Sequence, residues 1–428
     1  MAKAAQVKTR PQLELAGYQE RACASNQLRG KTEAIDQLRF GFFGEVGGLL
    51  ALVKKSHRDL QTADHDRITE ELGDALWYLT TVAVEYGSNL QAVGGEAILE
   101  LERRLGINRD AVKGKLTFEE FDGLMAFSHA KLSKDQIPGM LRQLASHCGS
   151  LLSESGDHDL AAHPPFQTLS ALLADLVTIG TLFGQRFADI AAANIAKVES
   201  RWPPEGTTHI PLFDEGKSSL EQFPRKFAMC FIERETPAGR PYVIQQLSGV
   251  NIGDRLTDNR TEPDGYRFHD VFHLAYLVHL GWSPVIRALL KLKRKSDPDV
   301  DENEDGARAM IIEEGIATWI FNHASRRDYF ESIEVGRLNY GILKQVVDMV
   351  DGYEVDKCPL WQWERAILDG FRVFRQLQAA AGGIVEVDLH ARTLEFRELP
   401  PEQLVAPEPK KRPRLVGAAP PPNVPPQS

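Results

Sequence analysis

Apolar residues recur at helical spacing between residues 32 and 56, and this regularity constrains the fold more than any other feature of the sequence. One face of a long helix would carry the side chains of Ile35, Leu38, Phe42, Val46, Leu49 and Val53. Similar patterns predict helices at 18–28 and 90–104, and a long helix from Arg67 to a glycine turn at 86–89. The N-terminal half is therefore expected to be an all-helical bundle.

Three carboxylates fall on two of these helices. Glu71 and Asp74 are three positions apart and share a helix face, and Glu45 lies on the preceding helix. A helical hairpin would bring the three together as a hard-oxygen site suited to Mg²⁺, with Mn²⁺ as a second choice, and through the ion to a polyphosphate. Glu70 points about 100° away and is a second-choice general base. The alternative is that these acids are ordinary residues on solvated helix faces.

The segments that carry these acids, LRFGFFGEVGGLLALVKK and EELGDALWYL, resemble the MazG-type all-α nucleoside triphosphate pyrophosphohydrolases over residues 18–104. The resemblance implies a Mg²⁺-dependent enzyme that splits a nucleoside or deoxynucleoside triphosphate into a monophosphate and pyrophosphate. It also implies that Glu45, Glu71 and Asp74 bind the metal and that Glu71, Glu45 and Glu70 are catalytic. Gly48 stands where the family has a second glutamate, so one expected metal ligand is missing.

A second helical copy follows the first. Residues 71–104 align with residues 168–201 without a gap, and both ends and the glycine turn coincide. We therefore expect two tandem helical domains, 13–110 and 111–205, although chance similarity between amphipathic helices would also give such an alignment. The second copy has no acid at the aligned positions, which are occupied by His147, Ser150, Thr168 and Ala171. It is not expected to hold Mg²⁺ by itself.

The last helix of the second copy contains polar residues that the first copy lacks. Asn194, Lys197 and Arg201 resemble the Asn-x-x-Lys helix of the family, whose polar groups face the phosphates. The first copy has Ala97 and Glu100 at the positions of Asn194 and Lys197. This complementary loss predicts one composite site, with acids from the first copy and phosphate-facing groups from the second. The alternative is that the residues of the second copy are ordinary surface positions.

Lys54 and Trp77 are further candidates for substrate binding. Lys54 could meet phosphate, but basic residues also complement the C-terminal end of a helix. Trp77 could stack on a base, although tryptophan in a helix of this kind is more often part of the core.

Residues 220–400 have a different pattern. Two β-rich runs around the turn 237–239 predict a hairpin, and IVEVDLHARTLEFREL predicts another. Helices are expected near 266–281, 284–295, 306–323, 335–350 and 360–380. The predicted fold class is thus mainly α, with a tandem MazG-like helical bundle followed by an α+β domain with small hairpins. The segments GDRLTDN, YRFHDVFHLAY and GWSP resemble a domain sometimes found after MazG-type domains.

A second site is suggested in this C-terminal domain. His269 and His273 are four positions apart and share a helix face, with Asp270 beside them, while Glu313 and Glu314 lie on a later helix. Two histidines and a glutamate from another helix are ligands of the zinc type, so a metal or catalytic site is one interpretation. The other is a plain helix, in which this histidine spacing is also common.

The acidic loop 297–305 imitates the start of an EF-hand. Glu302 occupies the position that requires glycine, and Arg308 the position that requires glutamate. A solvated charged loop is therefore expected there.

Charge and composition restrict the remaining function classes. A net charge of −10 argues against a general nucleic-acid binder. The four cysteines form no CxxC pair, and no apolar run reaches the length of a membrane span, about 18 residues, so we expect a cytoplasmic protein without a membrane partner. The Pro-rich tail 401–428 is expected to be disordered. The chain would be a monomer with an internal pseudo-dimer or a homodimer.

The main functional prediction is a nucleoside triphosphate pyrophosphohydrolase, and two alternatives compete with it. One is a nucleotide-sensing or scaffold protein that binds but hardly hydrolyses, which Gly48 and the acid-free second copy favour. The other places the chemistry at His269 and His273, with the N-terminal half as a nucleotide-responsive regulator. The base and the sugar of the substrate stay open, because the shape of the pocket decides both.

Overall fold

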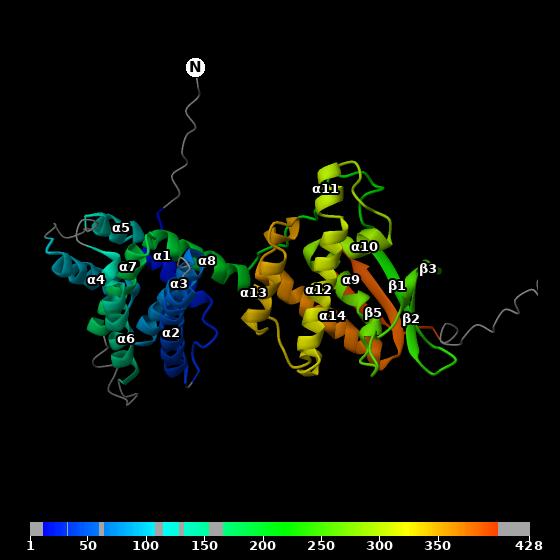
Figure 1. Cartoon of the computed structure of the whole chain (residues 1–428), viewed down its shortest axis with the longest axis horizontal. Helices are drawn as coiled ribbons and strands as arrows, with labels where there is room; N and C mark the ends of the chain where they lie inside the picture. Colours follow the sequence, from blue (N-terminus) through cyan, green and yellow to red (C-terminus); the bar gives the residue numbers. More distant parts are fainter. Residues whose placement is uncertain are drawn as a thin grey trace, which may run out of the picture. The chain divides into compact units, whose positions relative to one another are not determined.

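The computed structural model describes residues 12–31, 33–59, 64–107, 114–127, 132–153 and 166–400. The predicted tail 401–428 lies outside the described residues. Contacts divide the chain between residues 206 and 207 into an N-terminal and a C-terminal unit, coloured blue to green and green to orange in Figure 1. The N-terminal unit is helical and the C-terminal unit combines helices with a small antiparallel sheet, so the predicted fold class is confirmed.

The N-terminal unit contains two successive sets of helices in the described residues. The first set is α1 (Leu15–Ala24), α2 (Ala34–Asp59), α3 (His65–Glu85) and α4 (Leu90–Leu105). The second set is α5 (Phe118–Ala126), α6 (Ile137–Ser153), α7 (Phe166–Leu182) and α8 (Phe187–Arg201), with a 3₁₀ turn at Lys134–Gln136 before α6.

Polar caps set the ends of the first long helices. The carboxylate of Asp64 accepts hydrogen bonds from the backbone N–H groups of Asp66 and Arg67 at the start of α3. The amide oxygen of Asn89 caps α4 in the same way, and Gly106 ends α4 in the left-handed conformation that glycine adopts without strain. Both caps are short-range signals, which is why the helix bounds follow the sequence pattern closely.

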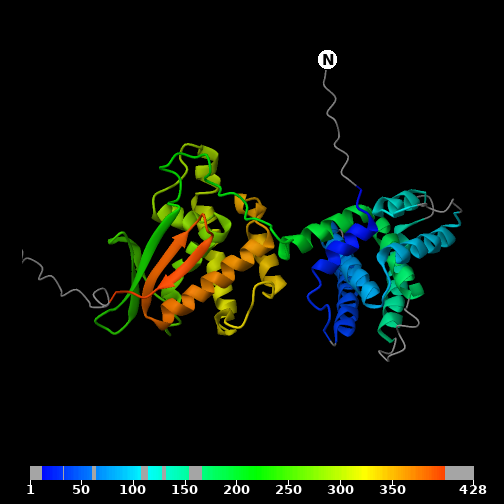
Figure 2. The ribbon, with the colours of Figure 1, turned by 180° about the vertical axis from the view of Figure 1, so that it is seen from behind.

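In each set, the third helix packs against the last helix of the other set. Helix α3 packs against α2 and against α8 of the second set, while α7 packs against α6 and against α4 of the first set. An antiparallel bridge between Glu14 and Thr117 joins the chain just before α1 to the chain just before α5. Figures 1 and 2 both show α8 lying along α1 and α3. The helix pairs α2–α3 and α6–α7 therefore each pack against a helix from the other half of the unit.

Apolar side chains fill the space between these helices. Leu38, Phe42, Val46 and Leu49 are buried, and Ile35 and Val53 pack against the same core, so the predicted apolar face of α2 is confirmed. No single helix among the described residues is long and apolar enough to cross a membrane. Helices α7 and α8 pass that test only as a pair bent by 104°. Most of α7 is buried in the core of this unit.

The C-terminal unit contains one described sheet, with the strand order β3-β2-β1-β4-β5 and every pair antiparallel. Its strands are β1 (Lys226–Glu235), β2 (Pro241–Leu247), β3 (Val250–Leu256), β4 (Gly382–Asp388) and β5 (Thr393–Arg397). Its helices are α9 (Asp270–Leu280), α10 (Pro284–Leu289), α11 (Pro298–Asn303), α12 (Ala307–Ala324), α13 (Tyr340–Met349) and α14 (Leu360–Ala379). Short 3₁₀ turns lie at Tyr266–Phe268, Asp328–Phe330 and Glu354–Lys357.

The two predicted hairpins form and are joined through the centre of the sheet. Met229 of β1 lies opposite Leu247 of β2 on one side and Val385 of β4 on the other. Helices α9 and α14 pack against each other and contact β4 and β5, and Figure 2 shows α14 running beside these strands. Aromatic rings fill the core beneath the helices, with the Phe272 and Phe371 rings 4.5 Å apart. The buried face of the sheet thus fixes the position of α9.

The structure corrects the sequence analysis at two places in this unit. Strand β3 was not predicted, because its side chains are mostly exposed and lack an apolar alternation. The acidic segment 297–305 is not a wholly solvated loop, because it contains α11 and because Asp305 is only 1% exposed. The carboxylate of Asp305 is buried against the guanidinium group of Arg294, 2.7 Å away.

Candidate functional site

The acids predicted to bind metal lie close together in the N-terminal unit. Glu45 on α2 forms a hydrogen bond with Glu71 on α3. The carboxylate of Glu71 lies directly over Gly48, where an added Cβ would stand only 2.1 Å from Oε2. Gly48 therefore gives room to the Glu71 carboxylate.

The neighbouring acids of this cluster shift the pKa of Glu45. Burial, together with the neighbouring charges of Asp74 and Glu71, raises the pKa of Glu45 to about 8, although Lys197 acts in the opposite direction. A carboxyl group with such a pKa holds a proton at neutral pH unless a cation takes the proton's place. The cluster is thus a local excess of negative charge that favours a bound cation.

Helix α8 supplies polar groups to the acids of α3. The ammonium group of Lys197 pairs with Asp74 and lies 2.9 Å from Oε1 of Glu70. The amide N–H of Asn194 donates to Oδ1 of Asp74 at 3.0 Å, while its amide oxygen accepts a hydrogen bond of 2.8 Å from the hydroxyl of Tyr18. The acids of the first helical set and the polar residues of the second therefore meet at one place.

Close packing between two helices makes this meeting possible. An added Cβ at Gly73 of α3 would lie 2.9 Å from Cβ of Asn194 on α8. A larger residue at position 73 would separate the two helices at the level of the acids. Arg21 of α1 fixes the other side of α8 through a bidentate contact with Glu199, with both N–O distances 2.6 Å.

The remaining substrate-binding candidates, Arg201, Trp77 and Lys54, differ in their position relative to the acids. Arg201 stacks on the ring of Trp202 at 4.4 Å and is near enough to Tyr78 to oppose the rise of the pKa of that phenol, which burial causes. The indole N–H of Trp77 donates to the hydroxyl of Ser25 at 2.9 Å, so this ring is tied to the end of α1. Lys54 is exposed and is turned about half a revolution from Glu45 on α2. Arg201 and Trp77 thus both border Tyr78, which lies near the acids, and the Trp77 ring meets the Tyr78 ring edge to face at 4.9 Å.

The second helical set contains a buried carboxylate that the sequence alignment did not single out. Asp175 on α7 is fully buried and lies 2.6 Å from Nη1 of Arg104 and 2.6 Å from Nδ1 of His147. The amide N–H of Gln143 also donates to it at 2.9 Å. The alignment places Asp175 opposite Tyr78, so no acid-to-acid match could reveal it. Basic groups of the chain itself surround this carboxylate, in contrast to the acid cluster on α3.

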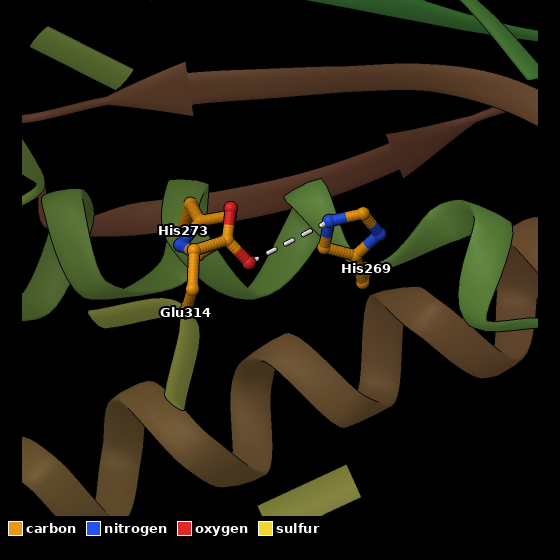
Figure 3. A group of neighbouring side chains, drawn as sticks. All are labelled: His269, His273 and Glu314. Atoms are coloured by element: carbon orange, nitrogen blue, oxygen red, sulfur yellow. Dashed lines mark ion pairs between the residues drawn. The ribbon is translucent and has the colours of Figure 1, made fainter. Parts of the chain in front are cut away.

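The histidines predicted for a second site come together in the C-terminal unit. His269 and His273 lie on one side of the start of α9, and Glu314 of α12 points between them (Figure 3). Oε2 of Glu314 is 3.8 Å from Nε2 of His269 and 3.5 Å from Nε2 of His273. Asp270 borders the group, with Oδ1 3.1 Å from Nε2 of His269.

The two consecutive glutamates of α12 have different surroundings. Glu313 is fully buried, and its Oε1 lies 2.9 Å from Nδ1 of His273, on the far side of the ring from Glu314. It also accepts hydrogen bonds from the hydroxyl of Ser283 at 2.7 Å and from the backbone N–H of Val285 at 2.8 Å. Glu313 therefore holds His273 and the start of α10, whereas only Glu314 faces both imidazole rings.

A separate pocket of about 600 Å³ lies beside the ends of β2 and β3. The segment GDRLTDN forms part of its wall, and no pattern in this segment predicts a cavity. Three guanidinium groups line it, from Arg240, Arg255 and Arg260. Its lining is therefore more basic than the chain as a whole.

Residues 208–400 match the family model of the MazG C-terminal domain. No curated protein and no solved structure matches the chain. The C-terminal region is thus MazG-related, which points to a nucleotide-related function in general. The match does not include the helical unit, whose resemblance to MazG-type hydrolases stays a prediction.

Proposed function

We propose that the N-terminal unit is a Mg²⁺-dependent nucleoside triphosphate pyrophosphohydrolase, which cleaves between the α and β phosphorus atoms and releases a monophosphate and pyrophosphate. One observation carries this proposal: Glu45, Glu71 and Asp74 converge with Lys197 and Asn194 in a single cluster. The MazG-related C-terminal region supports a nucleotide as the substrate class.

The donor atoms of the cluster fit Mg²⁺. Glu45, Glu71 and Asp74 offer carboxylate oxygens, which are the ligands that this hard cation prefers. The raised pKa of Glu45 results from burial and from its acidic neighbours, and a bound divalent cation would offset that repulsion. When bound, Mg²⁺ would neutralise phosphate charge and lower the pKa of an attacking water.

The side chains of the chain have separate roles in this proposal. Lys197, now paired with Glu70 and Asp74, would exchange part of this contact for non-bridging phosphate oxygens. Asn194 is held by Tyr18 and keeps its amide N–H directed at the same place. Glu70, which is not among the proposed metal ligands, would accept the proton of the attacking water, because a carboxylate that is not bound to metal can act as a general base.

The proposal is tested by measuring pyrophosphate released from a panel of ribonucleoside and deoxyribonucleoside triphosphates. We expect release from at least one of them in Mg²⁺ and none after the divalent ions are removed with excess EDTA. Binding of a triphosphate without release would instead support the nucleotide-sensing alternative. Release that is unaffected by EDTA would contradict the metal-dependent mechanism.

Gly48→Ala is expected to lower the rate of pyrophosphate release by about 10-fold or more, on the scale of lost transition-state contacts. The added methyl group would stand 2.1 Å from Oε2 of Glu71, so the carboxylate must move away from its present position. Activity is measured as kcat on the preferred triphosphate.

Gly47→Ala is the matched control for this variant. It lies on the same helix, and an added Cβ there would meet nothing within 4 Å among the described residues. Both substitutions replace a helical glycine with alanine and gain a similar helix propensity of about 1 kcal/mol. Equal activities of the two variants would show that the position of Glu71 next to Gly48 is unimportant.

A further inference from the structure

We propose that the C-terminal unit holds a divalent transition-metal ion of the zinc type, bound by His269, His273 and Glu314. The site is distinct from the acid cluster, since all three residues lie on α9, its N-terminal end and α12 (Figure 3). The proposal goes beyond triphosphate hydrolysis and does not depend on it.

The spacing of the ligand atoms fits one ion. One atom from each residue lies within 4.8 Å of the others. Ligands that stand about 2.0–2.1 Å from a tetrahedral zinc ion are about 3.3 Å apart from one another. The distances of 3.5 and 3.8 Å from Oε2 of Glu314 to the two Nε2 atoms are only slightly longer. A small rotation of the Glu314 side chain would therefore complete the site.

Both imidazole rings are oriented as metal ligands usually are. Nδ1 of His273 lies 2.9 Å from the carboxylate of Glu313, and Nδ1 of His269 lies 2.9 Å from the carbonyl oxygen of Tyr266. In both rings an acceptor oxygen holds Nδ1, so Nε2 is the nitrogen placed to bind a metal ion. The ring of Tyr266 stacks on that of His269 at 4.3 Å and holds it in plane.

An unsatisfied buried atom points into the site. The side chain of His273 is 0% exposed, and its Nε2 has no hydrogen bond of normal geometry among the described residues, since Oε2 of Glu314 lies 3.5 Å away. Burying such an atom without a partner costs stability. Nε2 of His273 and Oε2 of Glu314 face each other at 3.5 Å. A cation between the two groups would satisfy both.

The chemistry of the ligands selects the type of metal. Two imidazole nitrogens with one carboxylate suit Zn²⁺ and its neighbours in the first transition series, whereas Mg²⁺ prefers oxygen ligands alone. Three protein ligands leave a coordination position for water or an anion, as in catalytic zinc sites. Glu314 is 43% exposed, so this position can be reached from solvent.

Asp270 gives the site a further resemblance to a hydrolytic centre. The sequence His269-Asp270-Val271-Phe272-His273 has the spacing of the H-E-x-x-H zinc motif, with aspartate at the position of its general base. The carboxylate of Asp270 lies at the border of the site, 3.1 Å from Nε2 of His269.

The proposal is tested on the full chain, stripped of metal and titrated with Zn²⁺ in excess Mg²⁺, so that Zn²⁺ does not compete for the magnesium site proposed above. We expect the native chain to bind one equivalent of Zn²⁺. We also expect His269→Ala and Glu314→Gln to weaken this binding by more than the factor of about 10–100 that changes around the ligands cause. His390→Ala, at an exposed histidine on the β4–β5 turn, is the control and should bind Zn²⁺ normally.

Glu313→Gln separates the orienting residue from the ligands. It should keep the stoichiometry of one but lower the affinity for Zn²⁺ by about 10–100-fold, because Glu313 fixes the His273 ring without facing the ion. Circular dichroism establishes that each variant is folded. A folded native chain that binds no Zn²⁺, or equal binding by His269→Ala, Glu314→Gln and His390→Ala, would overturn the proposal.

Discussion

Replacing Glu71 with glutamine is expected to lower pyrophosphate release by at least about 100-fold, the scale seen when one charge-stabilising group is lost. The substitution removes one of the proposed metal ligands but keeps the size of the side chain. The glutamine can still occupy the space over Gly48 and can donate a hydrogen bond to Glu45. The loss of activity should therefore occur without loss of structure.

The same substitution is expected to stabilise the metal-free chain above pH 4.5. A carboxyl group whose pKa is raised on folding destabilises the folded state as the pH rises from the unfolded value to the folded one. For Glu45 this interval runs from 4.5 to about 8, and the charge of Glu71 is one of its causes. The melting temperature of Glu71→Gln should exceed that of the native chain most clearly near pH 8.

Pyrophosphate release and thermal melting by circular dichroism check these two expectations on the same samples. Glu96→Gln, at a partly buried glutamate on α4 that pairs with Arg103 at 3.5 Å, is the control for removing one negative charge from this unit. Activity above a tenth of the native value in Glu71→Gln would place the chemistry elsewhere. The cluster of His269, His273 and Glu314 would then be the next candidate.

Arg294→Met is expected to lower the free energy of unfolding of the C-terminal unit by about 3–5 kcal/mol, the cost of removing one partner from a buried ion pair. Arg294 is 2% exposed, and its Nη2 lies 2.7 Å from Asp305 and 2.7 Å from Glu354. It also donates to the carbonyl oxygen of Phe213. Methionine would fill much of the volume, but the buried Asp305 carboxylate would keep the backbone N–H of residue 294 and the more distant Arg287, at 3.5 Å, in place of its close guanidinium partner.

Urea unfolding followed by tryptophan fluorescence measures this loss, because four of the six tryptophans belong to the C-terminal unit: Trp282, Trp319, Trp361 and Trp363. Arg260→Met is the matched control, since Arg260 is 62% exposed and pairs with Asp264 at the surface. Such a pair contributes about 0–1 kcal/mol. Similar losses in the two variants would mean that burial of the Arg294 network does not matter.

Local patterns in the sequence account for most of the helices and for the residues of both clusters. The apolar period of α2, the caps of α3 and α4, and the His269–His273 spacing all act within a few residues. The meeting of α8 with the acids of α3 could be anticipated for a different reason. In the predicted alignment of the two copies, Asn194 and Lys197 occur only in the copy that lacks acids, and such a complementary pattern favours contact between the copies.

Long-range partners could not be predicted in this way. Arg294 and Glu354 are 60 residues apart, and nothing in the local sequence connects them. Asp175 aligns with Tyr78 rather than with an acid, so its burial became visible only when α4 and α6 were packed around it. Glu313 and Glu314 are neighbours in sequence, and only the packing of α9 against α12 distinguishes the residue that orients His273 from the one that faces both rings.

Helices α4 and α8 each pack against the other helical set, so the acid cluster is assembled as the helical unit folds. The contact between Lys197 and Asp74 spans 123 residues of chain, and almost the whole helical unit lies between its two ends or is packed around it. Neither half contains the helix that packs against its own α2–α3 or α6–α7 pair. A fragment with one half would therefore expose the apolar face that the missing helix covers. Contacts of such high sequence separation form late, after the entropy of a long loop has been lost. The acid cluster therefore gains its lysine only when the whole unit has folded cooperatively.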